Sequence, residues 1–509
     1  MNESNRRNPP VEPIVRAIFD HCVKLRRFAF ERFANQCRRS VSRNIGRDLP
    51  ETTRRGHKGV QFALAACAVA MVLLFSVAAA AQENEPETPG EETTPPAETT
   101  TDETEYAGEK ITKEERKSWE RQHRTKFTNA LRKLDTAEID LGVRYHLYGL
   151  TMEEYRDELP ELVRDFLDEL KSPVVSAESR EYANQEAVEV AQELLDQPPE
   201  VRINVCILVA SLNVENAGPR GEPAVPYIPA IDFHSAVLND PDQLVACKIW
   251  AAIGMGRIGR DAQPNVTQRS QIANSLAGAL AAPDAAGDEH MWYRMRLVEA
   301  MGNCGLTHNV TRQPVVIDGL MRALADPEEH FVVRATAARS IPQLPLGPGT
   351  EIPLICYEIG RLTNQMTQAR NQNLKAPYWK YCYLLVYSSF RPQLKEEQDK
   401  GWGLLNQTQQ AQLRQHAPVV NSLFDVILPV VNSVTESVQP QATPAPLLEG
   451  LGDWIQNNVP KNWKVTPESN ELKRPTEDEE ATMADAGGAD SGASVETGAA
   501  PSGNTSTGE

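Results

Sequence analysis

A leucine followed three residues later by a proline recurs four times in the middle of this chain of 509 residues. The successive prolines are 43, 42 and 44 residues apart, which is the period of an array built from two-helix units. A unit of two helices cannot bury its apolar face alone, so neighbouring units have to stack to form a core. The pattern therefore predicts an all-α fold. The four pairs are Leu195 and Pro198, Leu238 and Pro241, Leu280 and Pro283, and Leu324 and Pro327.

Apolar residues spaced four apart flank each proline, and this spacing places them on one face of a helix. Before the first proline they are Ala187, Ala191 and Leu195. We therefore expect each copy to contain a first helix, a turn at the proline and a second helix. The predicted apolar stripes of the second helices are Val201, Val205 and Val209; Val245, Ile249 and Ile253; Tyr293, Leu297 and Met301; and Val333, Ala337 and Ile341.

An arginine follows the first apolar residue of the second helix in three copies, as Arg202, Arg294 and Arg334, whereas the other copy has Ala246. Together with the proline turns, these residues resemble HEAT repeats in a short bacterial form, over residues 181–345. The resemblance implies an α-solenoid of HEAT-type helix pairs whose second helices line a concave face, and it specifies little chemistry. The function that it implies is binding of a protein or peptide partner, with no catalysis and no cofactor.

The two ends of the chain differ in composition from its middle. Residues 1–60 carry 14 Lys and Arg against 6 Asp and Glu. Phe62 to Ala81 is uncharged and long enough to span a bilayer. A basic segment before the span and an acidic one after it predict a cytoplasmic N-terminus and an extracytoplasmic remainder, in the periplasm or cell envelope. The span is either a signal peptide that is cleaved after Ala81 or an uncleaved membrane anchor.

Two acidic segments, residues 82–108 and 466–509, combine like charge with low hydrophobicity, and we expect both to be disordered. Because the net charge of the chain is −18, phosphate binding is disfavoured and nucleic acid is not an expected partner. The expected divisions are a basic n-region (1–60), a transmembrane signal segment (61–81), an acidic linker (82–108), a helical N-terminal cap (109–180), HEAT-type repeats (181–345), C-terminal helical repeats and cap (346–465) and an acidic tail (466–509).

Residues 218–229 interrupt the period with glycines and prolines, and insertions in repeat arrays often bind partners. Tyr227 and Ile228 are the apolar residues that this insertion would present; the alternative is a rigid turn tucked against its own repeat. Phase along the second helices adds six candidates for contact with a partner. Two of them are tryptophans, which often anchor interfaces but also suit packing between repeats. The six are Lys248, Trp250, Arg257, Trp292, Arg296 and Arg339.

Two histidine–acid clusters support an alternative function, that of a metal-dependent enzyme. Glu289 and His290 lie 40 residues before Glu329 and His330, so stacking would bring both clusters to one edge of the array. The resemblance to HEAT repeats raises this alternative, because HEAT-like deoxyhypusine hydroxylases bind iron through repeated His–Glu pairs. Here the order is reversed and the pairs come earlier in the repeat, which favours solvated residues at helix starts, where Glu suits the helix dipole. A purely structural spacer in the cell envelope is a third interpretation.

Other conspicuous residues favour a hydrophobic core over a site. Five cysteines between residues 206 and 382 lack paired spacing, and we expect them to be small buried hydrophobes. His234 is expected to be a core histidine with a local partner. The aromatic stripe that begins at Trp379 and the apolar run 419–438 are expected to be buried helices, because Asp425 and a proline within that run disfavour a second membrane span.

Overall fold

The computed structural model describes residues 108–475, apart from residues 123, 220–221, 283–284, 286, 288–289 and 438. The chain divides into two compact units, Met1–Thr101 and Asp102–Glu509, and every described residue belongs to the second unit. The predictions for the n-region, the membrane segment, cleavage after Ala81, nearly all of the linker and the tail beyond residue 475 therefore lie outside the described residues.

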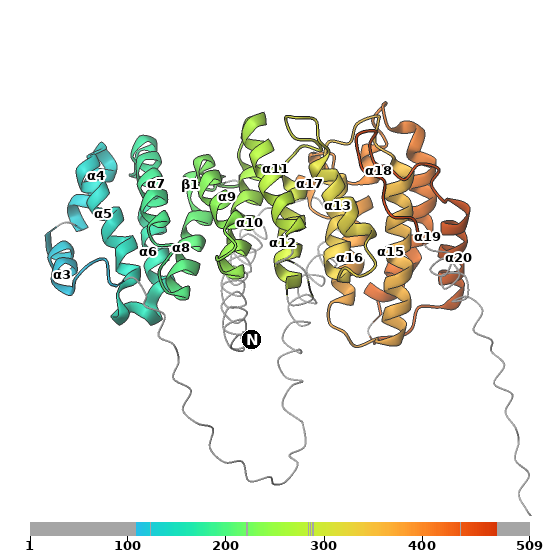
Figure 1. The fold of residues 1–509 in the computed structure, drawn as a ribbon, viewed down its shortest axis with the longest axis horizontal. Coiled ribbons are helices and arrows are strands. Elements are labelled where there is room, and N and C mark those ends of the chain that lie inside the picture. The colour runs from blue at the N-terminus through green and yellow to red at the C-terminus, as the bar shows by residue number, and fades with distance from the viewer. Residues whose placement is uncertain are drawn as a thin grey trace, which may run out of the picture. The chain divides into compact units, whose positions relative to one another are not determined.

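The described part of the chain is almost entirely helical (Figure 1), which confirms the all-α prediction. Its two short strands, β1 (Asn213–Glu215) and β2 (Val225–Pro226), pair antiparallel. The main helices are α3 (Lys113–Gln122), α4 (Arg124–Lys133), α5 (Thr136–Tyr148), α6 (Leu159–Leu170), α7 (Ala177–Gln192), α8 (Pro199–Ser211), α9 (Ile231–Asn239), α10 (Val245–Asp261), α11 (Val266–Ala281), α12 (Met291–Asn303), α13 (Val315–Ala325), α14 (Phe331–Ser340), α15 (Ile352–Gln372), α16 (Trp379–Phe390), α17 (Lys395–Asp399), α18 (Leu404–Gln407), α19 (Ala417–Thr435) and α20 (Ala445–Asn457).

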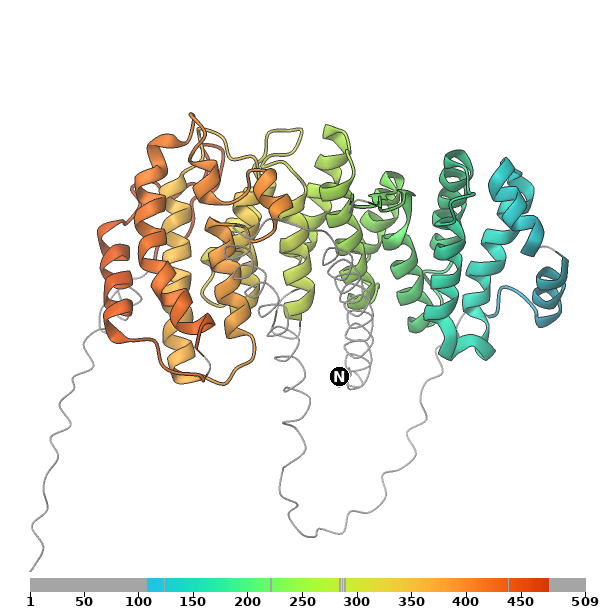
Figure 2. The same cartoon turned by 180° about the vertical axis from the view of Figure 1, so that it is seen from behind.

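Consecutive helices alternate between two rows (Figures 1 and 2). In the second-helix row, α6, α8, α10, α12, α14 and α16 each pack against the next. In the first-helix row, α9, α11, α13 and α15 do the same, and α5 packs against α7. The two rows are joined within each pair, as α9 with α10 and α13 with α14. The helix, turn and helix predicted around each leucine–proline pair are therefore found, and α5 and α6 add a further pair before them.

The buried stripe of α10 differs from the prediction, whereas those of α8, α12 and α14 are confirmed. In α10 the residues at the core are Cys247, Ala251 and Met255, and the predicted stripe that starts at Val245 is only half-buried. The predicted register was wrong by two residues. Both stripes of α10 are apolar, and the shift turns a different face of the helix toward its neighbours.

The arginines that open the second helices are bonded to the leucines of the repeated pattern. The Arg334 Nε donates to the carbonyl of Leu324 at 3.0 Å, and the Arg294 Nη1 donates to the carbonyl of Leu280 at 3.1 Å. These carbonyls lie in the last turn of a helix, where backbone oxygens lack partners within that helix. Each arginine therefore ties the start of a second helix to the end of the first helix of its own pair.

Of the other two copies, one makes this tie through a glutamine and the other has a lysine at the corresponding position. Arg202 donates to the Gln243 side chain at 3.3 Å, and the Gln243 amide donates to the carbonyl of Leu195 at 3.4 Å. Lys248 directly follows the first buried residue of α10, as the arginines do in the other copies. The sequence assignment of Ala246 to that place was wrong, because it followed from the shifted register.

Two helices beyond the repeats match their prediction, whereas the boundary of the tail does not. The region expected to hold C-terminal helical repeats (346–465) contains α15 and α16, with Trp379 and most of the expected aromatic stripe buried. The predicted tail begins too early, since residues 466–475 are packed on the fold. The Leu472 amide donates to the Trp463 carbonyl at 2.8 Å, and both side chains are buried.

Within the described residues, the segment Arg414–Thr435 is the helix whose length and apolar composition would suffice to cross a membrane. Its main part, α19, packs against α15, α16 and α20. The side chains of Val420, Leu423 and Ile427 on this helix are fully buried. This packing agrees with the expectation of a core helix.

Candidate functional site

The end of the insertion that contains Tyr227 is tucked against its own repeat. The Tyr227 side chain is buried, and its backbone amide donates to the Leu212 carbonyl at 3.1 Å. Burial raises the pKa of Tyr227 to about 12. Ile228 is half-buried and packs on the core. The expectation that Tyr227 presents itself to a partner is wrong, because the β1–β2 pairing folds the insertion back onto α10.

Lys248 also fails as a surface candidate, since its side chain is buried within α10. The error follows from the register of that helix, which places Lys248 beside the core residue Cys247. A lysine at this depth is a poor contact for a partner, because an approaching ligand cannot reach its ammonium group.

The other five second-helix candidates lie on the outward stripes of their helices. In α12 the outward stripe contains Trp292, Arg296 and Glu299, and in α10 it contains Trp250, Ile253 and Arg257. Within each helix these residues are three or four positions apart, so they lie on one face. We call the residues of these stripes the second-helix face. All are half-buried or exposed: Asn204, Ile207 and Ser211 of α8; Trp250, Ile253 and Arg257 of α10; Trp292, Arg296 and Glu299 of α12; Arg339 of α14; and Tyr381, Leu384 and Ser388 of α16.

The arginines of the second-helix face are already bonded within the protein. Arg257 donates to the Ala210 carbonyl and, at 2.7 Å, to the Asn213 Oδ1, which joins α10 to the end of α8. Burial lowers the pKa of this guanidinium. Arg296 pairs with Glu299 on its own helix, with 2.5 Å between Nη1 and Oε2.

Arg339 is bonded to α17, which lies across α14. Its Nη2 is 2.5 Å from the Oε1 of Glu397, and both side chains are largely buried by the contact. The α14 part of the second-helix face is therefore covered by the protein itself. Trp292, with 40% of its surface exposed, is the large apolar side chain that the face leaves most open among its described residues.

Of the described residues at the predicted metal edge, Glu329 and His330 have structural contacts. The Glu329 carboxylate accepts from the Arg294 Nε at 2.6 Å, which links the turn before α14 to α12. His330 is the N-cap of α14, and its Nδ1 accepts from the Val332 amide at 3.1 Å. His290 is the N-cap residue of α12, and Glu289 lies outside the described residues. Among the described residues, three or more His, Cys, Asp or Glu side chains do not gather anywhere in a geometry suited to a metal ion.

The five cysteines of the described part are buried and free, which confirms their expected place in the core. They are Cys206, Cys247, Cys304, Cys356 and Cys382. Burial raises the pKa of the Cys304 thiol to about 11. The raised pKa keeps the Cys304 thiol protonated, so this cysteine suits packing better than nucleophilic chemistry.

His234 of α9 is buried as expected, but the expected local partner is not there. Neither ring nitrogen has a hydrogen-bond partner among the described residues. Gly254 of α10 lies against the ring, and a Cβ at that glycine would be 2.2 Å from the His234 Nε2. Burial, with a smaller contribution from the charge of Arg257, lowers the pKa of His234 to about 3.

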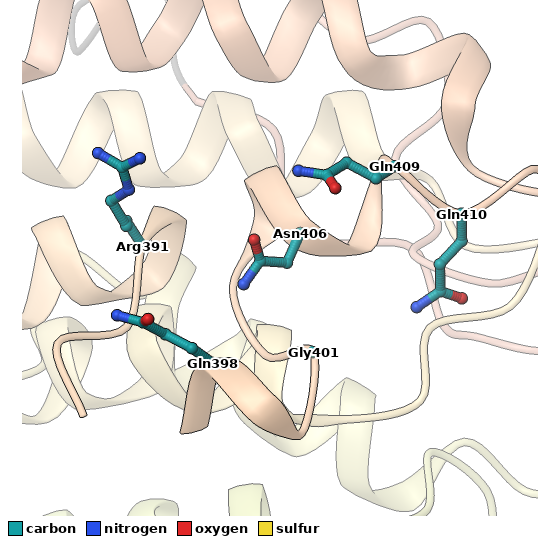
Figure 3. A pocket seen from close by; sticks show the side chains of 6 residues that line it. All are labelled: Arg391, Gln398, Gly401, Asn406, Gln409 and Gln410. Carbon is teal, nitrogen blue, oxygen red and sulfur yellow. The ribbon is translucent and has the colours of Figure 1, made fainter. Parts of the chain in front are cut away.

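A polar pocket of about 560 Å³ opens beside the C-terminal end of α16 (Figure 3). The sequence patterns gave no sign of it, because its residues lie on irregular segments and short helices that have no period. The pocket is lined by Arg391, Gln398, Gly401, Asn406, Gln409 and Gln410. Figure 3 shows Arg391 and Gln398 on one side of the hollow and Gln409 and Gln410 on the other.

The segment that builds this pocket, residues 391–410, is fixed to the second-helix row at several points. Gln407 donates to the Pro342 carbonyl at 2.9 Å and to the Leu344 carbonyl at 2.7 Å. Gly403 has a φ of 90°, and a Cβ there would lie 2.6 Å from the carbonyl oxygen of Phe390. A glycine is therefore required where the segment turns back toward α16.

The second-helix face and this pocket are the candidate sites that the geometry offers. No protein-family model matches the chain, and neither a curated protein nor a solved structure is found to be similar to it.

Proposed function

We propose that the helix pairs form a HEAT-type α-solenoid that acts as a scaffold and binds a protein or peptide partner through the second-helix face. Two observations support this. The leucine–proline period coincides with a row of second helices in contact, α8 to α14, and two of the pairs are held by the same arginine–leucine bond. Regular pairs of this kind build an extended surface instead of a closed cavity.

The observation that carries the binding proposal is the exposure of Trp292 on this face. A second tryptophan, Trp250, lies on the outward stripe of the adjacent helix α10 and is half-buried. Tryptophans that are partly open before binding are common anchors of interfaces, since they bury a large apolar area on association. The adjacent Arg296 and Glu299 form an ion pair with each other, so a partner that covers the tryptophans leaves no single charge without its counterion.

A site-specific photo-crosslinking experiment in cells tests this function. A photoreactive phenylalanine analogue replaces Trp292 in one variant and Trp250 in a second. The control replaces Val266, which is 68% exposed on the first-helix row. We expect one protein to be captured at both tryptophan positions and not at the control. Equal capture at all three positions, or capture at none, contradicts the proposal.

We further propose that the scaffold acts outside the cytoplasm. The support is the uncharged segment Phe62 to Ala81, with basic residues before it and acidic residues after it. Protease added to spheroplasts is expected to digest residues 108–475 while a cytoplasmic marker protein survives. Protection equal to that of the marker contradicts export. A high-salt wash of the membranes then separates an anchored chain from a cleaved one.

A further inference from the structure

The pocket next to α16 contains a guanidinium group that the protein itself does not use. In the described part of the chain, the Arg391 side chain has neither a hydrogen-bond acceptor nor a carboxylate partner. This distinguishes it from Arg257, Arg296 and Arg339 of the second-helix face, which are all bonded. The Arg391 side chain is exposed, so a ligand can reach its donors without displacing an internal contact.

Primary amides supply most of the remaining wall. The Asn406 Nδ2 donates to the Trp402 carbonyl at 2.8 Å, which leaves its Oδ1 as an acceptor. The Gln398 Nε2 is likewise held by the Pro392 carbonyl at 2.8 Å. The Gln409 side chain makes no hydrogen bond to any described residue, so both its donor and its acceptor are open. Each such amide can pair with an N–H or a C=O group.

The shape and lining of the pocket restrict the ligand that fits. A volume of about 560 Å³ is in the range of small-ligand sites. One guanidinium and no carboxylate among the lining residues favour a single anionic group, and a carboxylate matches the fork of an arginine. The lining includes no apolar or aromatic side chain, so it offers no ring for stacking of a sugar, and its apolar surface comes from the methylene groups of polar side chains.

We propose that this pocket binds the C-terminal end of a peptide chain: Arg391 pairs with the terminal carboxylate, and Asn406 and Gln409 pair with the adjacent peptide groups. A chain end carries its carboxylate directly beside a peptide group, so the guanidinium and the amides of the wall can pair with both at once. The inference gives a chemical class to a partner of the kind proposed above and in that respect rests on the proposed function. It lies at the end of the same row of helices, since Arg391 directly follows α16.

Two tetraglycine probes that differ only at the chain end test the pairing. N-acetyl-tetraglycine acid and its C-terminal amide are titrated into the full chain, and binding is measured by saturation-transfer NMR. We expect the acid to bind at least tenfold more tightly than the amide. Arg391→Gln is expected to abolish that preference. Gln409→Ala is expected to weaken both probes by the same factor, because it removes contacts to peptide groups alone.

Arg164→Gln is the matched control, since Arg164 is an exposed arginine on α6, and it is expected to keep the preference. Equal affinity of wild type for acid and amide overturns the proposal, as does a preference that survives Arg391→Gln. A hexuronic-acid oligomer that binds more tightly than the peptide acid overturns the assignment to a peptide. If the peptide acid does not bind but the Trp292 crosslink forms, the peptide-end pocket is refuted while the scaffold function stands. If the acid binds as expected but the crosslink does not form, the pocket stands and binding through the second-helix face is refuted.

Discussion

His234 is expected to make the stability of the folded unit fall in mild acid. Its side chain is 1% exposed between α9 and α10, and its ring nitrogens have no hydrogen-bond partner among the described residues. Protonation inside the fold would place a charge where no group compensates for it, which is why the pKa is lowered from 6.5 to about 3. The unfolded chain, in contrast, exposes the ring to water and takes up a proton near pH 6.5.

The size of the effect follows from the difference between these two pKa values. At pH 7.5 the ring is neutral in both states and costs nothing. At pH 5.0 the unfolded state is protonated and the folded state is not, which favours unfolding by about 2 kcal/mol. Because the folded pKa is the lower one, the contribution to stability is complete above pH 6.5, and the loss continues to grow until the pH approaches 3.

Urea denaturation of the wild type and of His234→Leu, at pH 7.5 and at pH 5.0, measures this effect. Leucine has a volume close to that of histidine and does not titrate. We expect the wild type to lose about 2 kcal/mol more than the variant between the two pH values. His416→Gln, at a half-buried position before α19, controls for the loss of any histidine and should lose as much as wild type. Equal losses in wild type and His234→Leu would refute the reasoning.

Three further predictions concern the packing of two glycines, a buried hydrogen bond and an ion pair. Gly254→Ala would place a methyl carbon 2.2 Å from an imidazole nitrogen, so in urea we expect a loss of about 2 kcal/mol. Gly278→Ala, whose added carbon meets nothing within 4 Å, should gain about 0.5–1 kcal/mol, and a loss in both contradicts the packing argument. Arg334→Met removes the donor to the buried Leu324 carbonyl and should cost about 2 kcal/mol in the same assay; a cost below about 1 kcal/mol contradicts that role. Arg339→Gln breaks the ion pair to α17, so trypsin should cut at the lysines flanking α17 several times faster, and an unchanged rate would mean that other contacts hold it.

The order of the helices could be predicted because the leucines and prolines mark the turns within each pair. A proline three residues after the last apolar position cannot continue the helix before it, so the signal is local and strong. The register of α10 could not be predicted in this way. That helix carries two apolar stripes, one from Val245 and one from Cys247, and only contact with α8 and α12 decides between them.

Contacts between distant parts of the chain explain the other differences. The residues after 465 are acidic and polar, yet the side chains of Trp463 and Leu472 are buried in the fold. The backbone amide of Asn470 donates to the Asp318 carboxylate at 3.4 Å. The ionic tie from Arg339 to Glu397 joins residues 58 apart in sequence, and no repeat spacing predicts it. The pocket at Arg391 depends on such ties, so sequence patterns did not reveal it.

The segment 391–410 has a mechanical consequence. A stack of helix pairs bends elastically through small changes in the angle between neighbours. This segment bridges several of those joints: Lys400 reaches the Arg260 carbonyl of α10 at 3.5 Å, Glu397 holds Arg339 of α14, and Gln407 is bonded just beyond α14. We therefore expect this segment to restrict bending between neighbouring helix pairs from α10 to α16. Under tension or on binding a large partner, most of the change in interhelical angles is then expected in the pairs before α10. The contacts between helix pairs near the Arg391 pocket are expected to change little.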